Sequence, residues 1–220
     1  MTGKEHTDCP YFLHSSIPIY AMVQQLHTTQ IRSPNATDSM YSVNMQMICT
    51  GDQFICTYLS PLDAVMGSRA LVRGDDHFWP IDFRQVDTRR FMKQHGRLSV
   101  AVNYAYGATE GRLVVSDAGH PLMTYTSASF DVPVEHRDHF TIRFPDSVVE
   151  RIETAYLRAG LSGFSETLDA MDTWTADQIA DAEAEALAHM PSTIVVEGAA
   201  INQFAIYDPE SADWVFTNFD

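Results

Sequence analysis

Apolar and polar residues alternate in one segment near the start of the chain, and a short apolar segment follows it. Tyr41, Val43, Met45 and Met47 alternate with polar residues, and after a turn at 50–52 a second apolar segment covers 54–59. A period of two is typical of a strand with one buried face. These two segments therefore predict a β-hairpin.

The same alternation returns further along the chain, in segments separated by turn residues. Successive turns lie roughly ten residues apart, a spacing typical of antiparallel strands. The predicted strands of this meander are 98–104, 113–116, 122–127 and 140–144. The short apolar segments 17–26 and 79–83 predict two further strands.

Two short helices are predicted within this strand-rich region. Ser60 can cap the free amide groups of a helix start, and Pro61 is tolerated at the first helical position, so we expect a helix from Pro61 to about Leu71. A second helix is expected to begin after the capping residue Asp87 and to end at Gly96.

After Pro145 the apolar residues recur every three or four positions, which is the period of an amphipathic helix. Helices are predicted at 146–160, 165–171 and 175–190, and strands follow at 193–196, 202–207 and 214–217. The fold class is therefore α+β: a largely antiparallel sheet with a helical block at about 146–190, inserted before a C-terminal strand pair. Residues 1–10 are expected to form a flexible tail, and residues 11–220 a single domain.

Charge is distributed unevenly along the chain. The formal net charge is −15, and residues 146–220 carry 15 acidic but only 2 basic side chains. Such a charge argues against direct binding to nucleic-acid phosphates. An acidic helical face is instead suited to a basic protein partner. The interaction residues predicted on this face are Glu150, Glu153, Asp177, Asp181, Glu183 and Glu185.

One short polar cluster, 135–139, contains residue types that could perform acid–base chemistry or bind a metal. Its candidate catalytic residues are His136, Asp138 and His139. The two histidines lie three residues apart between Pro133 and a predicted strand, where a solvated loop with local ion pairs is also expected. Asp75, Asp76 and His77 form a second polar run, which follows Gly74 and is typical of a turn.

Sequence motifs for nucleotide phosphates and for an activated serine are missing, so no cofactor and no metal is predicted. The first hypothesis is accordingly an accessory or regulatory protein that binds a partner through its acidic face. The alternatives are a small hydrolase or metal-dependent enzyme with its site near residues 136–139, and a structural homo-oligomer.

The location of the protein is predicted from its apolar segments and its cysteines. The chain has no apolar run long enough to cross a bilayer, its first residues are polar, and its three cysteines, Cys9, Cys49 and Cys56, suggest no disulfide framework. We therefore expect a soluble, cytoplasmic protein that does not bind membranes.

Overall fold

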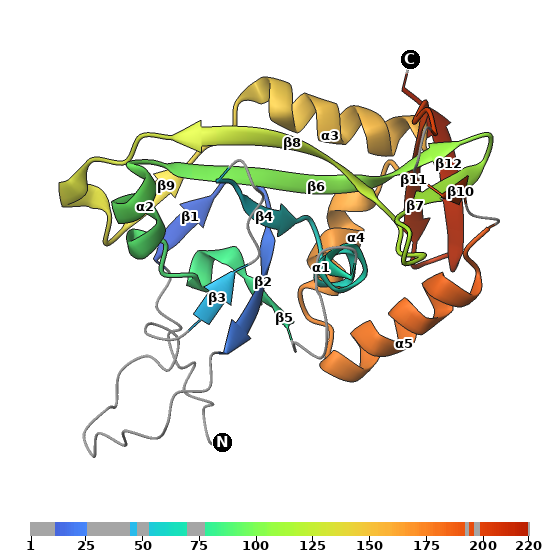
Figure 1. Ribbon diagram of the computed structural model, residues 1–220, viewed down its shortest axis with the longest axis horizontal. Coiled ribbons are helices and arrows are strands. Elements are labelled where there is room, and N and C mark those ends of the chain that lie inside the picture. The colour runs from blue at the N-terminus through green and yellow to red at the C-terminus, as the bar shows by residue number, and fades with distance from the viewer. Residues whose placement is uncertain are drawn as a thin grey trace.

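The computed structural model describes residues 12–25, 45–47, 53–69, 78–191, 194–195 and 199–219. The predicted tail 1–10, the polar run 75–77, Cys9 and Cys49 lie outside these residues. Five α-helices and a mixed, mostly antiparallel sheet make up the described part, which confirms the α+β class (Figure 1). No described helix is long and apolar enough to cross a membrane.

Strand β6 (Leu98–Thr109) is the centre of the main sheet. Its residues 98–108 are all buried, so this strand has apolar contacts on both faces. It pairs with four other strands. These are β4 (Ile55–Tyr58), β7 (Arg112–Val115), β8 (Met123–Phe130) and β11 (Gln203–Asp208).

The remaining strands extend the sheet on both sides of β6 or form a small second sheet. β2 (Tyr20–Gln25) pairs with β4, with β3 (Met45–Met47) and with β5 (Trp79–Asp82). β10 (Ile194–Val195) pairs with β7, and β12 (Asp213–Asn218) pairs with β11. β1 (Leu13–Ser15) and β9 (Phe140–Ile142) pair in parallel as a separate two-stranded sheet.

Two pairings differ from the sequence prediction. The expected hairpin of 41–47 with 54–59 is wrong, because β3 and β4 run in the same direction and both pair with β2, end to end along the edge opposite β5. The predicted strand at 140–144 exists as β9, but its partner is β1 and not a strand of the meander. Both errors have the same cause. Strand pairing was predicted from neighbours in sequence, whereas here it joins segments distant in sequence.

The helices begin and end for local reasons. Ser60 caps α1 (Pro61–Ser68) by accepting a hydrogen bond of 3.0 Å from the Asp63 amide, as predicted. α2 (Arg89–His95) ends at Gly96, whose φ of 80° lies in the left-handed region. Two short 3₁₀ helices lie at Phe83–Gln85 and Val134–His136.

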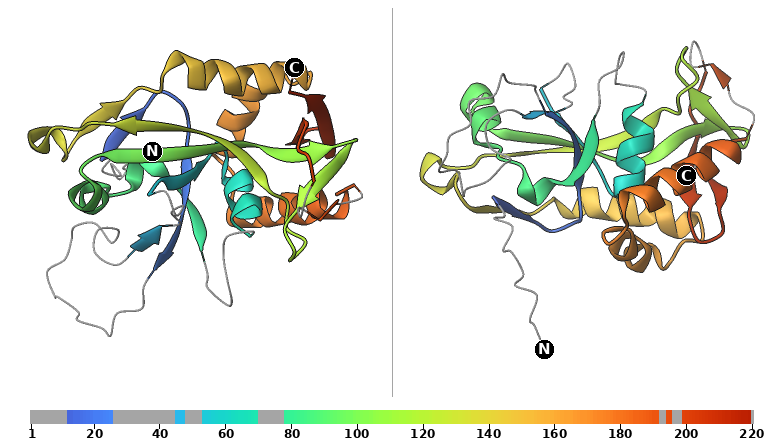
Figure 2. Two further views of the ribbon diagram at one scale, coloured as in Figure 1. Left: turned by 45° about the horizontal axis from the view of Figure 1, so that its top comes forward. Right: turned by 90° about the horizontal axis from the view of Figure 1, so that it is seen from below.

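The predicted helical block is confirmed as α3 (Asp146–Arg158), α4 (Phe164–Met171) and α5 (Ala176–Ala188). α3 and α1 lie on opposite sides of the long β6–β8 pair (Figures 1 and 2). α5 packs against α1, and the β11–β12 hairpin follows the block as the predicted C-terminal strand pair. Each of these elements contributes apolar side chains to one buried cluster. The buried residue that α5 contributes is Ala186.

Candidate functional site

A pocket forms where two strands meet end to end on one edge of β6. Val100 pairs with β4 and β8, and Tyr106 pairs with β11 and β8, so β4 and β11 occupy the same edge, opposite β8. β4 runs parallel to β6 and β11 runs antiparallel, so their carboxyl ends point toward each other. Both chains leave the sheet there, β4 into α1 and β11 into the turn at 208–210.

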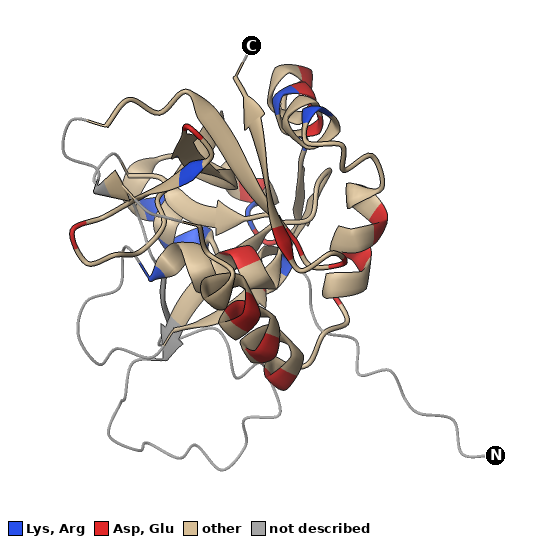
Figure 3. Ribbon diagram, turned by 90° about the vertical axis from the view of Figure 1, so that its right-hand side faces the viewer, with Lys and Arg blue, Asp and Glu red and all other residues tan. Residues whose placement is uncertain are grey.

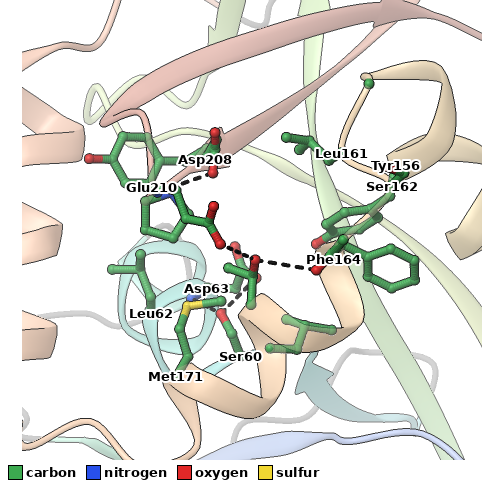
Figure 4. Close-up of a pocket in the computed structure, with 16 residues that line it drawn as sticks. Ser60, Leu62, Asp63, Tyr156, Leu161, Ser162, Phe164, Met171, Asp208 and Glu210 are labelled. Atoms are coloured by element: carbon green, nitrogen blue, oxygen red, sulfur yellow. Dashed lines mark hydrogen bonds between the residues drawn. The ribbon is translucent and has the colours of Figure 1, made fainter.

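We call the space between these ends the α1 pocket; its volume is about 260 Å³. Its lining comes from the start of α1, the end of α3, the α3–α4 turn, the inner face of α4 and the β11–β12 turn (Figure 4). The apolar walls include Leu62, Tyr156, Phe164 and Met171. The rings of Tyr156 and Phe164 lie with their centroids 4.5 Å apart.

The turn that closes α3 shapes one wall of the α1 pocket. The amide of Leu161 donates a hydrogen bond of 3.0 Å to the carbonyl of Tyr156, across Gly160. Gly160 has a φ of 78°, a left-handed conformation that glycine adopts without strain. This turn reverses the chain directly after Tyr156 and brings both Tyr156 and Leu161 to the pocket.

The surroundings of Asp63 shift the pKa of its carboxyl group. Ser60 Oγ donates a hydrogen bond of 2.8 Å to Asp63 Oδ2, and Tyr106 Oη donates one of 3.2 Å to Oδ1. Burial raises the pKa of Asp63 to about 6, and the two hydrogen bonds oppose this rise. Burial also raises the pKa of Tyr156, and the negative charge of Asp63 adds to that rise.

Two further carboxylates line the α1 pocket from the β11–β12 turn. Glu210 Oε1 accepts a hydrogen bond of 2.8 Å from the Thr167 hydroxyl on α4 (Figure 4). Asp208 accepts hydrogen bonds from the Glu210 amide and from the Ser211 hydroxyl. No Lys or Arg is among the residues that line the pocket, and none of the three carboxylates forms an ion pair with a described residue.

This arrangement has two chemical capabilities. Three carboxylates in a partly apolar enclosure attract a positive charge, since Coulomb forces are stronger where water is reduced. A carboxyl group whose pKa lies near 6 can also exchange a proton near neutral pH.

The candidate catalytic residues of the 135–139 cluster lie outside the α1 pocket, in the segment directly before β9. They do not share one set of contacts. Asp138 is largely exposed and forms an ion pair of 2.8 Å with Arg89 of α2. The ring of His139 contacts the ring of His14 edge to face, and His136 is exposed. Among the described residues, no group of three or more His, Cys, Asp or Glu is placed to hold a metal ion.

The predicted acidic residues divide between two helices. Asp177, Asp181 and Glu185 are exposed along α5, whereas Glu150 and Glu153 are exposed on α3, at a separate place on the surface (Figure 3). Glu183 corrects the prediction: it is buried, and its carboxylate pairs with the Arg69 guanidinium at the end of α1. Glu183 is thus a contact between α5 and α1, and not part of an exposed face.

The residues of the α1 pocket were not predicted as a site. In sequence, Asp63 is an acid in the first turn of a helix, Asp208 and Glu210 belong to a turn, and Tyr106 belongs to an apolar strand. Each feature has an adequate local explanation, so no local signal distinguishes them as a group. In comparisons with known proteins, no family model, no curated protein and no solved structure matches this chain.

Proposed function

We propose that this protein binds a small organic cation, an ammonium ion carrying an apolar group, in the α1 pocket. The observation that carries the proposal is the Asp63 carboxylate, which is held by two hydroxyl donors but faces no cationic side chain among the described residues. A bound ammonium ion would supply the missing positive charge and stabilise the ionised form of Asp63.

The walls of the α1 pocket support the apolar part of this ligand. Leu62, Phe164 and Met171 offer apolar contact, and aromatic rings attract a nearby cation through their electron-rich faces. At about 260 Å³ the pocket is slightly smaller than the roughly 300–1,000 Å³ typical of sites for drug-sized ligands. A short alkylamine or arylalkylamine is therefore the expected size.

Calorimetric titration with three hexyl compounds tests the proposal. Hexylamine should bind, while hexanol and hexanoate, which match it in length but not in charge, should not. Asp63→Asn should weaken hexylamine about tenfold or more, as expected for the loss of a charged hydrogen-bond partner. Asp117→Asn, an exposed hairpin-turn residue, is the matched control. Equal binding of hexanoate, or an unaffected Asp63→Asn variant, would contradict the proposal.

A second proposal is a basic protein partner bound along α5. Asp177, Asp181 and Glu185 are exposed at intervals of four residues, and no described Lys or Arg pairs with them. Like charges at this spacing repel by a few tenths of a kcal/mol per pair, which a basic partner would relieve. Reversing all three to Lys should slow association and leave the fold intact. A partner whose association rate ignores both the reversal and added salt would exclude this face.

A further inference from the structure

A second acidic pocket lies beside the α1 pocket, against the neighbouring stripe of α4. We call it the Tyr20 pocket; its volume is also about 260 Å³, and Tyr20, Asp82, Arg84, Asp169 and Asp172 are among its lining residues. Leu168 of α4 lines both pockets. It is 6 % exposed, so its side chain is an apolar wall shared by two polar cavities.

The Tyr20 pocket keeps a negative charge after its internal pairing is taken into account. The Arg84 guanidinium binds Asp82 through Nε, with distances of 3.0 and 2.8 Å to the two carboxylate oxygens. Asp172 accepts a hydrogen bond from the Tyr20 hydroxyl, and no described Lys or Arg forms an ion pair with Asp169 or Asp172. One cation on Arg84 therefore faces three carboxylates.

Adjacent residues of α4 contribute to the two cavities. Thr167 and Met171 line the α1 pocket, while Asp169 and Asp172 line the Tyr20 pocket. Residues at these positions lie on neighbouring stripes of one helix, with Leu168 between them. Around α4 the order is thus an acidic cavity, an apolar side chain and a second acidic cavity.

We infer that the ligand is a linear α,ω-diamine, with one ammonium group at Asp63, its methylene chain against Leu168 and its other ammonium group at Asp172. This inference rests on the proposed function, because it assigns the first ammonium group to the α1 pocket. The alternation of charge and apolar surface around α4, from Asp63 past Leu168 to Asp172, matches the alternation along a diamine. Joining two ammonium groups in one molecule makes the second contact intramolecular, which raises affinity without a new kind of interaction.

The test compares monoamines with diamines of equal chain length. Butylamine, hexylamine and octylamine are titrated against the corresponding diamines by calorimetry. We expect one diamine length to bind about tenfold or more tightly than its monoamine, and the shorter and longer diamines to bind less tightly than the best one, since a linker must match the span between two sites. Each complex should contain one ligand per chain.

Variants separate the two ends of the ligand. Asp172→Asn should reduce the advantage of the best diamine over its monoamine to less than threefold or so, while Asp63→Asn should weaken monoamine and diamine alike. Asp169→Asn provides a second substitution in the Tyr20 pocket, and melting temperatures show that each variant is folded. The exposed residue Asp146 lies in neither pocket, so Asp146→Asn is the matched control.

The outcomes distinguish the diamine inference from the proposal that the α1 pocket binds an ammonium ion. Monoamine binding that depends on Asp63, with no diamine advantage at any length, overturns the diamine inference and leaves the proposed function standing. A diamine advantage that survives both Asp172→Asn and Asp169→Asn also overturns the inference. Absence of binding by every amine overturns both proposals.

Discussion

The hydroxyl group of Tyr106, on the central strand, donates a hydrogen bond of 3.2 Å to Asp63 Oδ1 at the start of α1. Tyr106 is 1 % exposed, so a fixed donor from the middle of the sheet reaches the acid of the α1 pocket. The position of Asp63 is therefore set by its own helix through Ser60 and by the sheet through Tyr106.

Asp63 should make the stability of the protein depend on pH. The folded protein holds the Asp63 proton up to about pH 6, whereas the ordinary pKa of an aspartate is 3.8. The unfolded chain therefore loses this proton first, and the contribution of Asp63 to the free energy of unfolding falls as the pH rises from about 4 to about 6.

Asp63→Asn removes this dependence. The free energy of unfolding of the variant minus that of the wild type should increase by on the order of 2 kcal/mol between about pH 4 and about pH 7.5. Urea denaturation at the two pH values measures the difference, and Asp117→Asn is the control. A difference that stays constant or shrinks with rising pH would show that burial does not raise the pKa of the Asp63 carboxyl group.

Tyr106→Phe should raise the pKa of Asp63 above about 6. The substitution removes a donor that stabilises the carboxylate, while burial continues to favour the neutral acid. An NMR titration of the Asp63 carboxyl carbon measures the pKa directly. Tyr125→Phe removes a hydroxyl group from a tyrosine that is 53 % exposed and should leave the titration unchanged. A lowered pKa in Tyr106→Phe would contradict the assigned role.

Arg69→Gln should destabilise the protein more than a typical surface substitution. The Arg69 side chain is 45 % exposed but its partner Glu183 only 10 %, so the substitution leaves a largely buried carboxylate without its cation. We expect a loss of about 1–3 kcal/mol in the free energy of unfolding. Adding Glu183→Gln should recover part of that loss, which a double-mutant cycle measures.

The matched control for this pair is Arg112→Gln. Arg112 pairs with Glu110, and both side chains are exposed, so its loss should cost less than about 1 kcal/mol. Equal effects of the two arginine substitutions would mean that the Arg69–Glu183 pair does not hold α5 against α1.

Ile142→Ala should lower the free energy of unfolding by about 2–4 kcal/mol, and Val102→Ala by somewhat less. Both side chains are 1 % exposed or less, one in β9 and the other in the central strand, so each substitution leaves a cavity. Chemical denaturation measures both losses. Thr141→Ala, at an exposed position of β9, is the control and should have little effect. Unchanged midpoints for Ile142→Ala and Val102→Ala would contradict the packing described.

Features determined by neighbouring residues were predictable from the sequence. Ser60 and Pro61 predicted the start of α1, and the change of period after Pro145 predicted the helical block. Each depends on side chains within a turn or two of the backbone they influence. The alternation in 98–104 likewise predicted a strand, although β6 extends to Thr109 and is buried on both faces.

Pairing between distant strands and the α1 pocket were not predictable in this way. Nothing near 13–15 indicates a parallel partner at 140–142, and the pairing of both β3 and β4 with one edge of β2 depends on which pairing buries more apolar surface in the whole fold. The α1 pocket joins Asp63, Tyr156 and Glu210, each of which has a local reading as cap, core or turn. Their common position appears only when β4 and β11 meet on one edge of β6.

The pairing of β11 with β6 also affects the order in which the strands of the sheet can form during folding. The Gly111 amide and the Gln203 side chain are 92 residues apart in sequence yet joined by a hydrogen bond of 2.8 Å. Until β11 arrives, the edge of β6 at Tyr106–Ala108 presents unpaired backbone groups, and contacts of such separation form slowly. A nascent or refolding chain therefore carries an open strand edge through most of its assembly, and an exposed edge readily pairs with another chain. Refolding yield should fall with rising protein concentration, most steeply in variants that weaken the β11–β12 hairpin.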